Sequence, residues 1–181
     1  MGAAPLSALG SSILGAWRTN ARVTSRLIEA LPHAVWDAAV PDYQRKTVRD
    51  VAAHLHNARV GWLRTLGSEH GIKQPARIVQ RGVTQKQLVA ALARSSAGME
   101  ALLELALANG GSLPRSKRYV WQNLSLDVAH VLTYFVAHEA HHRGQIVMVA
   151  RQAGERLPSA IVAKLWWWKP ESRGGSRSKL G

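Results

Sequence analysis

The sequence predicts an all-α protein, a four-helix bundle followed by a short C-terminal helix. Apolar residues recur at three- and four-residue steps along four long segments, and the alternation typical of β-strands is not evident. Stretches with Gly, Pro and polar residues separate these segments. A chain of 181 residues is long enough for one such bundle and buries roughly 70% of its unfolded surface. We therefore expect one domain over residues 1–168 and a basic, disordered tail over residues 169–181.

The helical segments have recognisable starts and stops. Thr47 with Asp50, and Thr84 with Gln87, have the spacing of capping boxes, and Gly154 follows the last long segment. Loops are expected over residues 67–82 and 112–124. The predicted helices span residues 13–31, 47–66, 84–109, 125–153 and 159–168.

Histidines on the last long segment indicate a metal site. His138 and His142 are one helical turn apart, and 100° per residue places them with Gln145 on the apolar stripe that faces the core. Parallel imidazoles at this spacing, about 5–6 Å apart, bind a single divalent cation. Glu139 and His141 flank the stripe on opposite sides. The chain has no Cys, so a site for a soft metal has to use histidine.

The third ligand is expected from the second segment, which contains His54 and His56. The apolar stripe there includes Val51 and Leu55. His54 lies at the edge of this stripe and reaches inward, whereas His56 points more toward solvent, so we select His54. The remaining histidines are expected at the surface, in loops or beside the site: His33, His70 and His130.

Three neutral imidazoles with an open coordination position are typical of catalytic metal sites. Such a metal lowers the pKa of a bound water or thiol. Glu139, His141 and Gln145 are the candidate catalytic residues, because they are placed for proton transfer or for orienting a ligand. The same stretch, His138 to His142, also satisfies the zinc-protease pattern HExxH. A metalloprotease is the weaker interpretation, because no His follows His142 to supply a downstream ligand.

Two stretches resemble the DinB/YfiT-like superfamily of metal-dependent enzymes: DVAAHLHNARVGWL (50–63) and YFVAHEAHHRGQIVMVARQAGERLP (134–158). Val51 stands where the early family motif has Leu. The resemblance implies a four-helix bundle, often dimeric, with one divalent metal on His54, His138 and His142. The metal is zinc, nickel or another ion. Characterised relatives include transferases and isomerases that use low-molecular-weight thiols such as bacillithiol and mycothiol.

These observations favour a metal-dependent transferase that uses a low-molecular-weight thiol as cosubstrate, or a hydrolase, acting on a small molecule. Without Cys in the chain, the thiol has to come from a cosubstrate. Two alternatives stay open: a nucleic-acid-binding module and a metal-free helical interaction protein. A homodimer is expected from the resemblance alone.

The formal net charge of +13 points to an acidic partner. The distribution of the charges along the chain does not indicate which kind of partner this is. Residues 164–181 carry five basic groups and one acidic group, and the remaining charge is scattered without a long basic stripe or interleaved aromatics, so nucleic acid is not favoured. The sequence has no segment long enough to span a membrane and no convincing signal peptide, which predicts a cytoplasmic location without membrane contact. The Trp166–Trp168 run is expected to cap the core or to serve a dimer interface.

Overall fold

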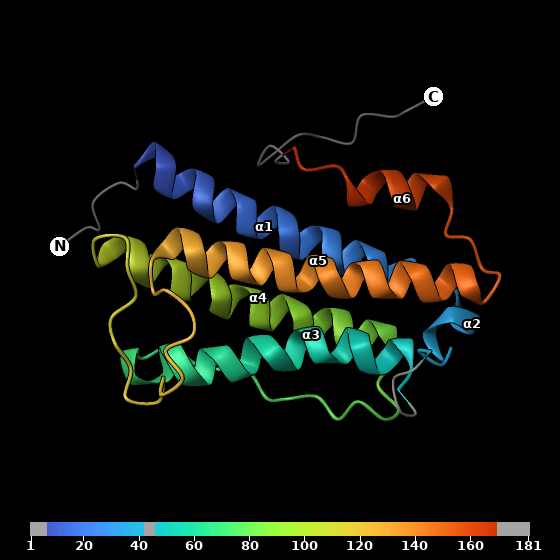
Figure 1. The fold of residues 1–181 in the computed structure, drawn as a ribbon, viewed down its shortest axis with the longest axis horizontal. Helices are drawn as coiled ribbons and strands as arrows, with labels where there is room; N and C mark the ends of the chain where they lie inside the picture. The colour runs from blue at the N-terminus through green and yellow to red at the C-terminus, as the bar shows by residue number, and fades with distance from the viewer. Residues whose placement is uncertain (1–6, 42–45, 170–181) are drawn as a thin grey trace.

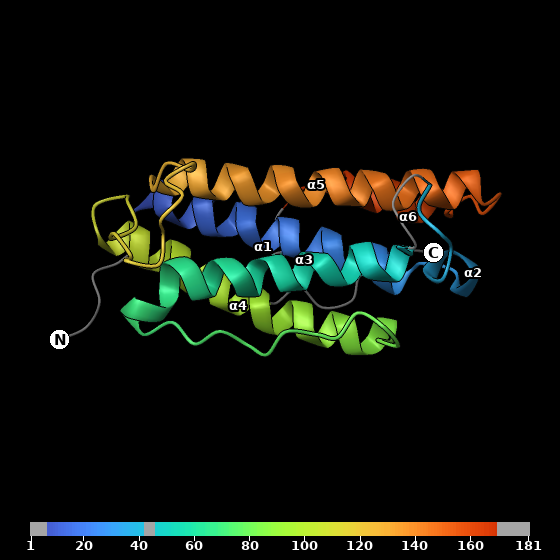
Figure 2. The same cartoon turned by 60° about the horizontal axis from the view of Figure 1, so that its bottom comes forward.

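The computed structural model describes residues 7–41 and 46–169. Four long helices lie side by side as a bundle, and a short C-terminal helix lies beside the first of them (Figures 1 and 2). The described residues contain no strand, only two isolated β-bridges. The all-α prediction is confirmed. The elements in chain order are α1 (Ala8–Glu29), α2 (His33–Trp36), α3 (Val48–Trp62), the π-helix η1 (Leu63–Gly67), the 3₁₀-helix η2 (Ser68–His70), α4 (Gln85–Ala108), α5 (Val128–Gln152) and α6 (Ser159–Leu165).

Side-chain caps set the helix starts. Both predicted capping boxes are present, at the beginning of α3 and of α4. The predicted start of the last long helix at Ser125 is wrong, because Asp127 is the N-cap of α5. The Asp127 carboxylate accepts the backbone N–H groups of Ala129 and His130, whereas the Ser125 hydroxyl accepts only that of Asp127.

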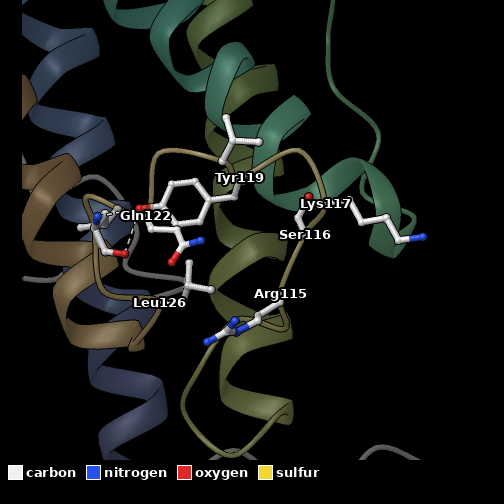
Figure 3. Close-up of a pocket in the computed structure, with 8 residues that line it drawn as sticks. Arg115, Ser116, Lys117, Tyr119, Gln122 and Leu126 are labelled. Carbon is white, nitrogen blue, oxygen red and sulfur yellow. Dashed lines mark hydrogen bonds between the residues drawn. The ribbon is translucent and has the colours of Figure 1, made fainter.

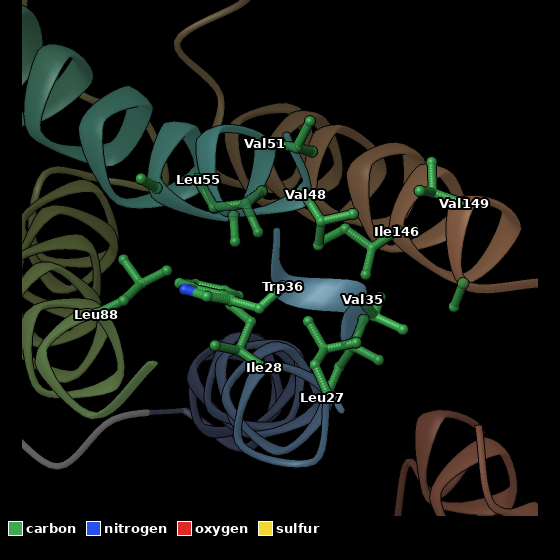
Figure 4. Packing of buried hydrophobic residues seen from close by; sticks show 14 of the residues in the cluster. Leu27, Ile28, Val35, Trp36, Val48, Val51, Leu55, Leu88, Ile146 and Val149 are labelled. Carbon is green, nitrogen blue, oxygen red and sulfur yellow. The ribbon is translucent and has the colours of Figure 1, made fainter. Parts of the chain in front are cut away.

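Two apolar clusters fill the bundle, one toward each end. At one end, Trp36 of the short helix α2 lies between α1, α3 and α4, close to Ile28, Leu55 and Leu88 (Figure 4). At the other end, Trp17 packs edge-on against Phe135. Between these two clusters, α5 buries Glu139 and Arg143, and α1 buries Thr24 beside Val23.

The C-terminal prediction about the tryptophans is wrong in part. Trp166, Trp167 and Trp168 are 81%, 58% and 38% exposed, so none of them caps the core. Instead α6 packs against the core through partly buried Val162 and Leu165. The three tryptophans cannot all face the core, because consecutive residues point about 100° apart. The predicted disordered tail lies outside the described residues except for Lys169. None of the described helices is long and apolar enough to cross a membrane.

Candidate metal centre

Three histidines from two helices converge on one point beside the bundle core. His138 Nε2 on α5 lies 3.3 Å from His54 Nε2 on α3 and 3.2 Å from His142 Nε2 one turn further along α5. One ligand atom of each residue lies within 4.8 Å of the others. Nitrogens about 2.0–2.1 Å from a tetrahedral ion are roughly 3.3–3.4 Å apart. The structure therefore brings the three predicted ligands together, and this histidine cluster could hold a metal ion.

Neighbouring side chains orient the cluster. Gln145 Oε1 lies 2.7 Å from His142 Nδ1. Because an amide oxygen only accepts hydrogen bonds, Nδ1 carries the proton and Nε2 keeps its lone pair toward the cluster. Tyr134 stacks on the His138 ring, with an interplanar angle of 12°. Gln145 thus accepts the hydrogen bond from the second ring nitrogen that usually holds the ring of a metal-binding His in its orientation.

The electrostatic environment keeps all three imidazoles neutral. Burial is the main cause, and it lowers the pKa of His138 to about 4, with the neighbouring His142 and His54 adding to the effect. Burial also lowers the pKa of His54 and of His142, although the hydrogen bond to Gln145 acts against it at His142. Neutral imidazole is the form that binds metals, so no proton has to leave these residues at neutral pH.

A small polar cleft opens beside His54 and His142. Its volume is about 80 Å³. One water occupies about 30 Å³ in the liquid, so the cleft has room for about two water-sized groups and little more. It is lined by Val40, Lys46, Asp50, Val51, His54, Gln80, His142 and Gln145. A ligand bound at the cluster would therefore meet one cation, one carboxylate and two amides.

Glu139 lies in the core instead of facing the cluster. Its side chain is 1% exposed. Its carboxylate accepts hydrogen bonds from Arg59 at 2.7 and 2.9 Å, from Asn20 at 2.9 Å and from Thr24 at 2.8 Å. All the hydrogen bonds given to this carboxylate by described residues come from these three side chains, so the geometry offers no contact for the predicted proton transfer by Glu139.

The core stripe predicted for α5 is correspondingly wrong. The stripe that faces the core contains Phe135, Glu139, Arg143 and Ile146, while the histidines lie one position away, half-buried in the groove toward α3. The prediction fails here because it places the charged residue Glu139 on the flank of the apolar stripe and the histidines on the stripe itself. Glu139 is buried because it pairs with Arg59, and Arg143 because it lies 3.8 Å from the Glu139 carboxylate and donates hydrogen bonds to α1.

Five of the buried polar residues form a polar layer that ties the four long helices together: Asn20, Thr24, Arg59, Glu139 and Arg143. Arg59 of α3 pairs with Glu139 of α5 and donates to the Leu92 carbonyl of α4 at 3.0 Å. Arg143 donates to Asn20 and Thr24 of α1. The layer lies between the two apolar clusters, and its residue Glu139 directly follows His138 in the sequence. The layer therefore fixes the positions of the helices that carry the three histidines.

This arrangement does not fit the metalloprotease interpretation. In an HExxH protease the Glu acts as a general base at the metal. Here Glu139 is turned into the core and paired with Arg59, and the third histidine comes from α3, upstream of the motif.

The other predicted residues lie outside the cluster. His141 is exposed, with its ring centroid 5.1 Å from that of His142, so it has access to solvent beside the site. The expectation that His56 points toward solvent is wrong. It is fully buried, contacting Ser95 Oγ at 3.1 Å and the Ala76 carbonyl at 2.9 Å, because the 71–84 loop covers that side of α3. His33 and His130 are exposed and His70 is half-buried.

A family model described as the DinB family matches residues 6–174, which is nearly the whole chain. No curated protein matches the chain significantly.

The buried pair should show strong energetic coupling. We expect Arg59→Met and Glu139→Gln each to lower the free energy of unfolding by about 3–5 kcal/mol, because each leaves a buried partner uncompensated. The double variant should lose clearly less than the sum, by about 1–3 kcal/mol. Guanidinium denaturation of the four proteins measures this coupling.

The exposed pair between α1 and α4, Arg18 with Glu100, is the matched control. The cycle of Arg18→Met and Glu100→Gln should give a coupling of about 0–1 kcal/mol. Equal coupling at the two pairs would contradict the special role of the buried one.

Proposed function

Because the chain belongs to the DinB family, we propose that its histidine cluster binds one divalent metal ion and that the protein is a metal-dependent enzyme acting on a small molecule. The observation that carries the proposal is the convergence of three imidazole nitrogens, at 3.2 and 3.3 Å, beside a polar cleft. Imidazole donors suit zinc, nickel and several other divalent ions, so the donor set leaves the metal's identity open.

Hydrogen bonding within the cluster favours a cation over a metal-free function. His138 Nε2 faces a second imidazole nitrogen on both sides. A ring nitrogen either donates one proton or accepts through one lone pair, so His138 Nε2 cannot make two good hydrogen bonds to these partners. Three neutral nitrogens with lone pairs turned to one point are satisfied together by a metal ion. This argument supports the metal centre over a metal-free interaction protein.

The proposed chemistry is activation of a thiol or a water. Three protein ligands leave a position for an exogenous group, and a bound divalent ion lowers the pKa of a thiol or water held there. The chain has no Cys, so a thiol has to be a separate cosubstrate. The cleft has room for the thiol group itself, and Lys46 and the amides of Gln80 and Gln145 at its lining suit polar groups close to that thiol. We therefore favour thiol transfer, with hydrolysis as the second candidate.

The chain's own residues take distinct roles in this proposal. Gln145 holds His142 in the metal-binding tautomer, and His141 exchanges protons between the site and solvent. Glu139 acts as a positioning residue through Arg59, in place of the catalytic role predicted for it. The homodimer and the cytoplasmic location stay predictions.

Metal content tests the proposal directly. We expect the purified protein to carry about one equivalent of a divalent metal, and His138→Ala to lower this below about 0.2 equivalents. Elemental analysis by mass spectrometry measures both. His130→Ala is the matched control, since His130 is an exposed histidine on the same helix and lies outside the cluster.

A chelator provides the second readout of the same experiment. Stripping the metal should lower Tm of the wild type and leave that of His138→Ala unchanged, because only a site that binds metal gains stability from it. Metal below about 0.2 equivalents in the wild type after reconstitution, with no effect of chelator, would overturn the proposal.

The choice between thiol and water is tested with cobalt. We expect L-cysteine or glutathione to add a sulfur-to-metal charge-transfer absorption to the Co²⁺-substituted protein, because the open position accepts a thiolate. S-methylcysteine, which lacks the thiol, is the control and should add none. If saturating thiol leaves the spectrum unchanged, thiol transfer is wrong and hydrolysis becomes the better proposal.

A further inference from the structure

Arginines from four parts of the chain, η1, the 71–84 loop, α4 and the α4–α5 loop, line two depressions that share Arg77. The 71–84 loop runs along α3 toward the start of α4 (Figures 1 and 2). One depression of about 430 Å³ is lined by Arg64, Arg77 and Arg118, and a second of about 490 Å³ by Arg77, Arg81 and Arg94. Because Arg77 lines both, we treat them as one arginine groove made of these five residues.

The charges of this groove are almost uncompensated. All five arginines are exposed. Among the described residues, Glu69 is their only ion-pair partner, and its carboxylate lies 4.0 Å from Arg118. Elsewhere arginines have closer carboxylates: Arg18 pairs with Glu100 and Arg59 with Glu139. Several like charges held together without acids create a local positive field that attracts an anionic partner.

The loop that carries the groove is anchored on both sides of Arg77. The Ala76 carbonyl contacts the ring of buried His56, and the backbone of Ile78 exchanges two hydrogen bonds with the Asn57 amide, both at 2.9 Å. Fixed backbone on each side of Arg77 reduces the conformational entropy that binding would cost. This anchoring also accounts for the burial of His56, which the metal centre does not use.

The chemistry of the groove fits phosphate groups. The planar guanidinium binds a phosphate through two parallel N–H groups, so each arginine of the groove can contact one phosphate of a nucleic-acid backbone. A further basic depression is formed by the α4–α5 loop that carries Arg118, where Arg115 and Lys117 extend from the chain around Tyr119 (Figure 3). Trp121 of the same loop is 67% exposed, as a side chain that stacks on a base has to be.

We propose that the arginine groove, which contains none of the three clustered histidines, binds the phosphate backbone of nucleic acid. The sequence indicated scattered charge because Arg64, Arg77 and Arg118 are far apart in the chain, and the 71–84 loop with the α4–α5 loop brings them together. The fold thus brings together arginines that the sequence shows only as scattered charge.

The test compares two variants with the same net charge. The groove variant is Arg64→Gln/Arg77→Gln/Arg118→Gln. The control variant is Arg151→Gln/Arg156→Gln/Lys164→Gln, three exposed residues of α5, the α5–α6 connection and α6. Each loses three positive charges from the full chain. Fluorescence anisotropy with a labelled 20-nucleotide DNA, single-stranded and as a duplex, gives Kd at about 50 and 200 mM salt.

We expect the groove variant to bind DNA at least about tenfold more weakly than the wild type. The slope of the logarithm of the binding constant against the logarithm of the salt concentration should become shallower by about 2, because three phosphate contacts are lost. The control variant should bind within about twofold of the wild type, and His138→Ala should bind normally, which separates this proposal from the metal centre. Circular dichroism checks the folding of each variant, and Arg77→Gln alone, with a smaller loss of about threefold or more, serves if the triple variant unfolds.

Three results would overturn the proposal. Equal weakening in the groove and control variants would mean that only net charge matters. A wild-type Kd weaker than about 10⁻⁴ M even at about 50 mM salt would mean that no nucleic-acid site exists. Displacement of the DNA by polyglutamate as efficiently as by unlabelled DNA would point to an acidic polypeptide as the partner.

Discussion

The buried ion pair between Arg59 and Glu139 is the interaction on which the rest of the structure depends. Removing charges from water is costly, so the pair contributes little net stability compared with apolar residues of the same size. Its effect is on register. A slip of α3 against α5 by one turn, about 5.4 Å, would leave both charges buried and unpaired. Asn20 and Thr24 each accept a hydrogen bond from Arg143 and donate one to the Glu139 carboxylate. These hydrogen bonds extend the constraint to α1.

The register of the two helices sets the geometry of the metal centre. His138 directly precedes Glu139, and His54 lies on the same helix as Arg59. The contact that aligns the charges therefore aligns the imidazoles, at 3.3 Å across the groove. The centre lies at the half-buried edge of the bundle, where burial keeps the histidines neutral and the adjoining cleft still admits a small ligand.

Local patterns predicted the fold well, and long-range pairing explains the errors. The capping boxes at Thr47 and Thr84 were predictable because each uses residues three positions apart. The two histidines of α5 were predictable from a single helical turn, and choosing His54 needed only the edge of one stripe. Glu139 was misjudged because its partner Arg59 is 80 residues away in the chain. His56 and the arginine groove were missed for a related reason: the 71–84 loop has no periodicity that would reveal which side of α3 it covers.

The central claim is that a buried charge pair, outside the ligand set, holds the metal ligands in place. The most direct measurement is the Kd of Co²⁺ or Zn²⁺ for folded Glu139→Gln, which keeps all three histidines and the side-chain shape. The account predicts binding weaker by about 10–100-fold, as is typical when a residue supporting metal ligands is changed. His130→Gln, a change at an exposed histidine of the same helix, should leave Kd unaltered. An unchanged Kd in folded Glu139→Gln would contradict the account.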